Sequence, residues 1–155
     1  MFQTIHLRKL LSSLALTLGT GFLASILSGN QREVYASLNK PPFAPPGVVF
    51  GIVWIILYVC MGISLYLVRT TPGKHTGAEK LFGLQLLLNF CWPLLFFGLG
   101  LYCFSAVWLG VLLVVIVLTM LAFWRINPAA FWWLLPYLLW CGFALYLNIG
   151  VCLLN

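Results

Sequence analysis

Five long runs of apolar residues, separated by short polar segments, dominate the pattern along this chain of 155 residues. The runs cover residues 10–27, 48–68, 81–98, 106–123 and 131–154. A helix of about 20 residues, rising ~1.5 Å per residue, crosses the ~30 Å hydrocarbon core of a bilayer. Because the runs are continuous rather than alternating, helices are favoured over the strands of a barrel. The pattern predicts an all-α membrane protein, a bundle of five transmembrane helices that forms a single domain over residues 1–155.

The composition agrees with a membrane location and narrows the chemistry. The chain is 63% hydrophobic and 6% charged, with a mean hydropathy of +1.09, which exceeds what a soluble domain of this length can bury. The two acids, Glu33 and Glu79, lie outside the apolar runs, and so do the histidines His6 and His75. Conventional acid–base or metal catalysis within the membrane is therefore unsupported, and no metal site is predicted. The net charge of +6 is scattered, so we expect contact with membrane lipid and no nucleic-acid binding.

The cysteines show no spacing that is typical of a metal site. They are Cys60, Cys91, Cys103, Cys141 and Cys152. Nearly all of them fall within the apolar runs, where a free cysteine usually behaves as a small hydrophobic residue. We expect them to pack in that way.

Only the connection between the first two runs, residues 28–47, is long. It contains Pro41, Pro42, Pro45 and Pro46, which favour extended, polyproline-like backbone over helix. The other connections are too short to form a separate soluble domain.

Basic residues are distributed unevenly between the two ends of the predicted helices. The amino-terminal side has six of the eight Lys and Arg residues: Arg8, Lys9, Arg69, Lys74, Lys80 and Arg125. The opposite side has Arg32 and Lys40. Since loops rich in Lys and Arg usually face the cytoplasm, we expect a cytoplasmic amino terminus, with the first loop and the carboxyl terminus outside. We expect the membrane to be a bacterial cell membrane.

Four of the runs carry ordered stripes of small, polar or aromatic residues. Small residues recur on one face of the first run, which favours close packing against another helix: Ser13, Thr17, Thr20, Ala24 and Ser28. The second run places Trp54 and Tyr58 one turn apart. The stripe of the third run consists of Gln85, Asn89, Trp92 and Phe96. That of the fifth consists of Tyr137, Trp140 or Cys141, Ala144 and Asn148. The fourth run has few such residues and is expected to face the lipid.

These stripes have two interpretations. Amides commonly bond across packed membrane helices, and tryptophans commonly lie in a belt at the membrane surface. However, Trp54, Trp92 and Trp140 lie deeper in their runs than such a belt requires. Together the rings and amides suggest a cavity for a flat, mostly apolar ligand with a few polar anchors.

Three separated segments carry motifs that occur in the same order in a known family. They contain Tyr35, Leu38, Lys40-Pro41, Pro45-Pro46-Gly47, Val53-Trp54 and Leu57-Tyr58, then Gln85-Leu86, Asn89, Trp92 and Phe96-Phe97, and finally Pro136-Tyr137, Trp140, Phe143-Ala144, Tyr146-Leu147-Asn148 and Asn155. On these residues the chain resembles, over nearly its whole length, the TspO/translocator protein family, the tryptophan-rich sensory proteins once called peripheral benzodiazepine receptors.

The resemblance implies a bundle of five transmembrane helices, commonly dimeric, with a pocket below the loop that follows the first helix. It also implies porphyrins such as protoporphyrin IX, or haem, as ligands, sterols in some members, and synthetic benzodiazepine- or isoquinoline-type ligands. Matching positions imply a pocket formed by Tyr35, Pro45, Trp54, Tyr58, Asn89, Phe96, Trp140 and Ala144, and the stripes add Trp92 and Tyr137. We expect a homodimer that binds a porphyrin or haem and requires no cofactor. No histidine lies within a run to ligate iron, which favours metal-free porphyrin over haem.

Three functions are compatible with these features. The first is a sensory or regulatory protein that binds tetrapyrroles. The second is light-dependent porphyrin degradation, in which Trp54 and Trp140 would be catalytic, because they match a pair linked to that reaction in bacterial relatives. The third is facilitated transport of porphyrins or sterol-like lipids, since ion-coupled transport generally needs ionisable residues inside the membrane.

The chain departs from the family pattern at two places. Val34 precedes Tyr35, where many relatives have a tryptophan. In addition, no basic residue follows Tyr146, although the sterol-recognition pattern of animal members requires one there.

Overall fold

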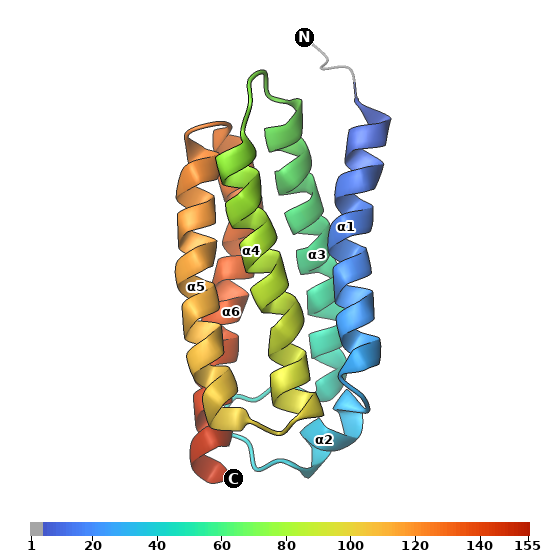
Figure 1. Cartoon of the computed structure of the whole chain (residues 1–155). Helices are drawn as coiled ribbons and strands as arrows, with labels where there is room; N and C mark the ends of the chain where they lie inside the picture. The colour runs from blue at the N-terminus through green and yellow to red at the C-terminus, as the bar shows by residue number, and fades with distance from the viewer. Residues whose placement is uncertain (1–4) are drawn as a thin grey trace.

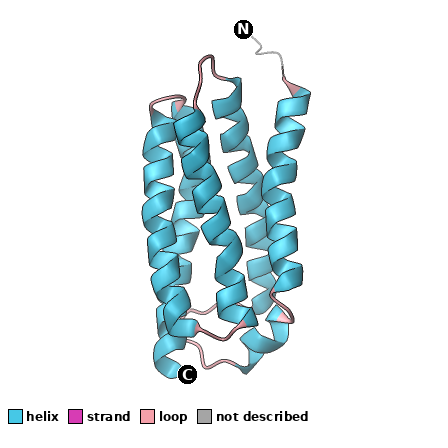
Figure 2. Ribbon diagram, viewed as in Figure 1, coloured by secondary structure: helices cyan, strands magenta, loops and turns pink. Residues whose placement is uncertain are grey.

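The structure, a computed structural model, describes residues 5–155 and is built of helices joined by short loops (Figure 1, Figure 2). Within these residues, five helices are long and apolar enough to cross a membrane. They are α1 (Leu7–Leu27), α3 (Gly47–Thr70), α4 (Thr76–Pro93) with the π-helical turn Leu94–Gly98 that continues it, α5 (Tyr102–Trp124) and α6 (Pro128–Leu154). The predicted all-α membrane bundle is confirmed.

The helices extend beyond the apolar runs that predicted them, mainly at their amino-terminal ends. α1 begins at Leu7, before Arg8 and Lys9, and α4 begins at Thr76, five positions before its run begins at 81. A long basic side chain at a helix end can reach the membrane surface while its backbone stays helical. Hydrophobicity therefore marks the lipid-embedded part of each helix and not its full length.

The first connection contains a helix that the sequence reasoning missed. α2 (Gln31–Ser37) follows α1 directly, and the Asn30 side chain caps it by accepting a hydrogen bond from the backbone N–H of Glu33 at 3.4 Å. The prediction of extended, non-helical backbone holds only for residues 38–46, which we call the covering loop.

The covering loop closes one end of the bundle. The first turn of α1 lies at the opposite end, whereas the carboxyl terminus and the covering loop lie together (Figure 1). Asn155 binds both backbone groups of Asn39: its Oδ1 accepts from the Asn39 N–H at 3.0 Å, and its Nδ2 donates to the Asn39 carbonyl at 2.8 Å. The Tyr146 hydroxyl donates to the Pro42 carbonyl at 2.9 Å. The loop is thus attached to α6 before it returns to α3.

Glycine at position 150 lets the covering loop approach α6 closely. A Cβ atom there would lie only 2.4 Å from Cγ of Pro41, so a larger residue would push the loop away. Next to this contact, Phe43 has a φ of 66° and is 89% exposed. The left-handed conformation is unusual for a residue with a large side chain, and it turns the loop back towards α3.

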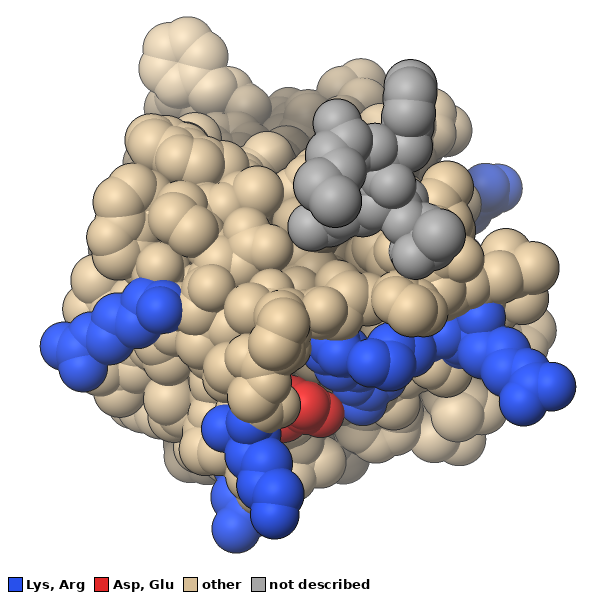
Figure 3. Space-filling model, turned by 90° about the horizontal axis from the view of Figure 1, so that it is seen from above, with Lys and Arg blue, Asp and Glu red and all other residues tan. Residues whose placement is uncertain are grey.

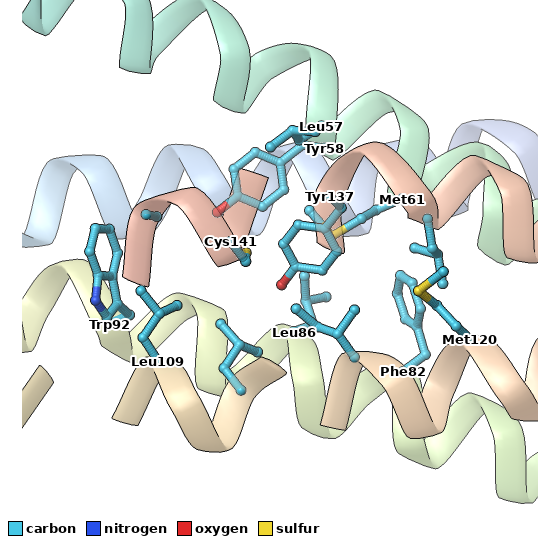
Figure 4. Packing of buried hydrophobic residues seen from close by; sticks show 14 of the residues in the cluster. Leu57, Tyr58, Met61, Phe82, Leu86, Trp92, Leu109, Met120, Tyr137 and Cys141 are labelled. Atoms are coloured by element: carbon cyan, nitrogen blue, oxygen red, sulfur yellow. The ribbon is translucent and has the colours of Figure 1, made fainter. Parts of the chain in front are cut away.

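The core lies between α3, α4, α5 and α6, and its side chains interdigitate along the bundle axis (Figure 4). The rings of Phe82 and Phe123 stack in it with centroids 5.8 Å apart. The prediction that the fourth run faces the lipid is wrong, because one side of α5 is buried against α4 and α6, with Leu109, Leu112 and Ile116 almost fully covered. A helix that is apolar all round carries no pattern that shows which side faces protein. Of the five spans described, α1 is the least buried: 17% of its most apolar 18-residue stretch is buried, against 44% for α5.

The small residues of α1 pack against α3 as predicted. Ser13 and Thr17 are fully buried, and the Thr17 hydroxyl donates to the backbone carbonyl of Tyr58 at 2.8 Å. Gly62 faces them, and a Cβ on it would lie 2.9 Å from Oγ1 of Thr17. Close approach of the two helices therefore depends on small residues on both sides.

Two of the cysteines form a disulfide bond, contrary to the expectation that the cysteines act only as small hydrophobic residues. Cys103 in the first turn of α5 is bonded to Cys152 in the last turn of α6, and their Cα atoms lie 4.9 Å apart. The two residues are 49 positions apart, and only the antiparallel packing of α5 and α6 brings them together. Cys60, Cys91 and Cys141 are free and at least partly buried, as expected.

The end of the bundle with the amino terminus is rimmed by Lys and Arg side chains (Figure 3). Arg69, in the last turn of α3, forms an ion pair with Glu79 at 3.3 Å. Its backbone carbonyl accepts a hydrogen bond from Nζ of Lys9 at 2.7 Å, so the ends of α1, α3 and α4 are linked there.

Candidate functional site

A cavity of about 520 Å³ lies between α1, α3 and α4, near the end of the bundle that the covering loop closes. We call it the main cavity. It is lined by Leu18, Gly21, Phe22, Ala24, Ser25, Gln31, Phe50, Gly51, Trp54, Ile55, Tyr58, Asn89, Trp92, Pro93 and Phe97. Its volume falls within the ~300–1,000 Å³ of small-molecule sites, and its lining is mostly apolar and aromatic. Phe22 and Ile55 are 67% and 61% exposed, so part of the cavity lining belongs to the surface that faces lipid in a membrane.

Helical spacing on α3 creates the aromatic wall of the main cavity. Phe50, Trp54 and Tyr58 follow one another at intervals of four residues and therefore share a face of the helix. The Trp54 ring lies 5.7 Å from that of Tyr58 and 6.4 Å from that of Trp92 on α4. Gly21 of α1 leaves the space that the Tyr58 ring occupies, because a Cβ there would lie 2.2 Å from Cε2 of the ring.

A second, more polar cavity of about 330 Å³ adjoins the main cavity. We call it the vestibule. The two share Ser25, Gln31, Phe50, Gly51 and Phe97 as lining residues. The vestibule is completed by Gly29, Asn30, Arg32, Tyr35, Gly47 and Val48. An apolar chamber therefore continues into a polar one beside α2 and the start of α3.

Tyr35 fastens α2 to the covering loop at the edge of the vestibule. Its hydroxyl donates to the Pro45 carbonyl at 2.6 Å, and its ring packs edge-on against Phe50 with centroids 5.0 Å apart. Nζ of Lys40 lies 4.8 Å from the centre of the Tyr35 ring and donates to the carbonyls of Tyr35 and Leu38. Burial raises the pKa of Tyr35, so the hydroxyl stays protonated and keeps its hydrogen bond throughout the neutral range.

A chain of hydrogen bonds connects the main cavity to the core. The Tyr58 hydroxyl donates to Oδ1 of Asn89 at 2.6 Å, and Nδ2 of Asn89 donates to the Tyr137 hydroxyl at 2.9 Å. The Tyr137 hydroxyl in turn donates to Oε1 of Gln85 at 2.8 Å. Figure 4 shows the two tyrosine rings projecting from α3 and α6 towards α4. Asn89 therefore serves primarily to join three helices, with only its remaining lone pair and N–H open to a ligand.

Trp92 is held by a similar polar contact on its far side. Its Nε1 donates to Oδ1 of Asn148 at 2.9 Å, and Nδ2 of Asn148 donates to the Tyr102 carbonyl at 2.7 Å. The Phe96 ring stacks on Trp92 with centroids 5.4 Å apart. The orientation of the Trp92 indole is thus fixed before any ligand arrives.

The structure divides the predicted site residues into two groups. Tyr35, Trp54, Tyr58, Asn89 and Trp92 line the main cavity or the vestibule. Within residues 5–155, the other predicted residues do not line either cavity: Pro45, Phe96, Tyr137, Trp140 and Ala144. Most of these support a lining residue: Pro45 holds Tyr35, Phe96 stacks on Trp92, and Tyr137 bonds to Asn89. Ala144 is buried in α6. A direct role in ligand binding stays a prediction for all of them.

Trp140 packs behind the cavity wall. Its ring contacts Phe50 edge-on, with centroids 5.6 Å apart, and Phe143 at 5.5 Å. Phe50 therefore stands between Trp140 and the main cavity. Among the described residues, Nε1 of Trp140 is a buried donor without a hydrogen-bond acceptor.

Several lining residues escaped the sequence reasoning. Phe50 could have been found, since it lies one turn before Trp54 on the same stripe. Phe97 could not, because α-helical spacing from Trp92 points to Phe96. The π-helical turn inserts one residue into that register, so Phe97 lines the two cavities and Phe96 does not. The contribution of α1 was also missed, because its small residues were assigned wholly to helix packing.

The lining of the two cavities combines aromatic faces with hydrogen-bonding groups. Across the part of the chain that the structure describes, His, Cys, Asp and Glu side chains do not gather in threes that could hold a metal ion. The rings of Trp54 and Trp92 instead offer faces for stacking, and the vestibule offers hydrogen-bonding groups.

Comparison with known proteins gives a consistent assignment. The family model described as the TspO/MBR family matches residues 13–154. The chain is 38% identical over 146 residues to the "Tryptophan-rich protein TspO" of Chlorobaculum tepidum, covering 92% of each chain. It is 38% identical over 129 residues to the "Translocator protein homolog" of Schizosaccharomyces pombe, covering 80% of this chain and 79% of the relative. To the human "Translocator protein" it is 36% identical over 143 residues, covering 90% of this chain and 85% of the relative.

Proposed function

Because the chain belongs to the TspO/MBR family, we propose that this integral membrane protein binds porphyrins or related tetrapyrroles in a sensory or regulatory role. The observation that carries the proposal is the main cavity, which is apolar, walled by fixed aromatic rings and continuous with a polar vestibule. A tetrapyrrole has the matching form, a flat aromatic body with polar groups along one edge.

The rings of the cavity provide the contacts for such a body. Trp54 and Trp92 are inclined to each other by 33°, and a flat ligand in the main cavity would lie against both. Gly21 and Gly51 line the cavity without side chains and leave it room. Protoporphyrin IX, which needs no iron ligand, is the first probe, and haem is a second ligand of the same shape.

Titration of the purified protein with protoporphyrin IX tests the proposal. We expect saturable quenching of tryptophan fluorescence, because the ligand would contact Trp54 and Trp92. Trp132→Phe is a matched control, since Trp132 is 57% exposed in the first turns of α6, at the far end of the bundle. It should lower the total fluorescence and leave the dissociation constant unchanged. Quenching that rises linearly with porphyrin and does not saturate would contradict the proposal.

Light-dependent oxidation of the bound porphyrin by molecular oxygen is a second candidate function. It is favoured by the position of Trp54, an oxidisable indole in the cavity wall whose ring lies 6.3 Å from Tyr137. Illumination of the complex should then bleach the porphyrin faster than in protein-free micelles, and Trp54→Phe should remove the acceleration. Equal bleaching rates in wild type, variant and micelles would reject the degradation function and leave the binding function standing.

We also propose that the covering loop faces the outside of the cell and the amino terminus faces the cytoplasm. Two observations support this orientation. Six of the eight basic residues are at the amino-terminal end. The Cys103–Cys152 disulfide is at the other end, and disulfides persist mainly in oxidising compartments.

A further inference from the structure

The vestibule differs from the main cavity in carrying a charge. Among the residues of the described chain that line the two cavities, Arg32 is the one charged side chain. It lies in the first turn of α2 and is exposed to the vestibule. A ligand that fills both cavities would therefore meet apolar rings at one end and a guanidinium at the other.

The guanidinium of Arg32 is free for a ligand. Within residues 5–155, the ion pair that forms is the one between Arg69 and Glu79, at the opposite end of the bundle. Glu33, the nearest acid in sequence to Arg32, makes no ion pair with it.

Lys40, the other basic residue at this end, already uses two of its three N–H donors in hydrogen bonds within the protein. Its Nζ donates to the carbonyls of Tyr35 and Leu38 at 2.8 and 2.9 Å and lies over the Tyr35 ring. Lys40 therefore stabilises the covering loop and does not line the vestibule, whereas Arg32 lines it. The sequence alone could not distinguish the two.

Polar neighbours complete the surroundings of Arg32. Asn30 uses its Oδ1 to accept the Glu33 N–H, which leaves its amide N–H groups to donate. Gln31 donates through Nε2 to the Ser28 hydroxyl, which fixes the wall between the two cavities. The vestibule thus presents donors, and donors favour an anionic or acceptor group.

We propose that the vestibule is a carboxylate subsite in which Arg32 binds an acidic group of a ligand whose apolar body fills the main cavity. The inference rests on the proposed tetrapyrrole function and makes it narrower: the preferred ligands carry a carboxylate at one edge. A guanidinium binds a carboxylate through two parallel hydrogen bonds. Neutral ligands, including esters and sterols, lack this contact and gain binding free energy only from the main cavity.

Two porphyrins with the same macrocycle and different charge test the inference. Protoporphyrin IX carries two carboxylates, and its dimethyl ester carries none. Each is titrated against wild type, Arg32→Gln and Arg32→Lys in nanodiscs of a zwitterionic lipid. Arg125→Gln, at the opposite end of the bundle, is the control for loss of one positive charge, and thermal unfolding of each variant reports its folding.

We expect Arg32→Gln to weaken binding of the diacid about fivefold, the scale of a partly exposed ion pair. The ester should bind wild type and Arg32→Gln equally. Arg32→Lys should retain part of the preference for the diacid, because it keeps the charge and loses the two-bond geometry. Arg125→Gln should change neither affinity.

The outcomes separate this inference from the function on which it rests. If both porphyrins bind wild type and Arg32→Gln with unchanged affinities, the subsite is wrong and the porphyrin function stands. If Arg32→Gln weakens the acid and the ester equally, Arg32 has a structural role and the subsite is again wrong. If neither porphyrin binds wild type saturably, the proposed function fails and the inference fails with it.

Discussion

Asn89 binds two tyrosine hydroxyl groups from two different helices, and this position decides what its amide can do. Oδ1 accepts from Tyr58 and Nδ2 donates to Tyr137, so the side chain was correctly predicted as a polar group on the inner face of α4. Helical spacing shows which residues share a face but not which partners they meet. The sequence could therefore not decide between an amide that joins helices and one that binds a ligand.

Asn89→Ala should destabilise the protein. The substitution leaves the hydroxyls of Tyr58 and Tyr137 with fewer partners in a buried environment, which typically costs about 1–3 kcal/mol. We expect a lower midpoint of thermal unfolding in detergent. Tyr58→Phe, which removes one hydroxyl from the same chain of hydrogen bonds, should lower it less. A midpoint equal to that of wild type for Asn89→Ala would show that the contacts do not stabilise the bundle.

Trp54 and Trp140 should differ in their effect on ligand binding. Trp54 lines the main cavity, whereas Trp140 lies behind Phe50. Trp54→Leu should weaken porphyrin binding about fivefold or more, since an aromatic contact contributes roughly 0.5–1.5 kcal/mol beyond its buried area. Trp140→Leu should have a smaller effect on the dissociation constant. Equal losses in the two variants, measured by porphyrin absorbance, would place the ligand between α3 and α6 instead.

At the scale of the helices, the apolar runs correctly predicted the five membrane-spanning helices. The inner faces of α3 and α4 could be predicted from the helical spacing of their aromatic and amide residues. Two features of the helices could not be predicted from hydrophobicity and spacing. The π-helical turn after Pro93 shifts the register by one residue and brings Phe97 to the cavities beside Trp92. α5 is apolar on every side, so hydrophobicity could not distinguish its packed side from its lipid side.

The contact between α6 and the covering loop should affect ligand binding, because Pro45 of this loop holds Tyr35 at the edge of the vestibule. Gly150→Ala would place a Cβ against Pro41 and displace the loop, so porphyrin should dissociate faster and bind more weakly. Gly142→Ala is the matched control, because a Cβ at that position of the same helix meets no atom within 4 Å. Stopped-flow measurement of dissociation distinguishes them. Identical rates for the two variants would show that the loop position does not govern release.

At the scale of the whole molecule, the two ends of the bundle differ in charge and in covalent structure. The amino-terminal end carries most of the basic residues (Figure 3), and the other end carries the disulfide and the covering loop. The charge difference could be predicted from the sequence. The disulfide could not, since it depends on α5 and α6 being antiparallel neighbours.

Breaking the disulfide should lower the stability of the folded protein. Cys103 and Cys152 enclose a long segment of chain, and a bond of this kind typically contributes about 2–4 kcal/mol. Cys103→Ser should therefore lower the midpoint of thermal unfolding, and a reductant should lower that of wild type but not of the variant. In intact cells, a maleimide should label Cys103 and Cys152 only after reduction. Labelling without reductant would argue against an oxidising environment at that end.

The lipid-facing part of the main cavity lining, at Phe22 and Ile55, has a consequence for how affinity is defined. A ligand that enters there comes from the bilayer, where an apolar molecule is already concentrated by partitioning. Occupancy then follows the mole fraction of ligand in the lipid and not its total concentration in the sample. Adding empty vesicles at constant protein and ligand should empty the site, and dissociation constants from preparations with different lipid contents become comparable only when expressed per lipid.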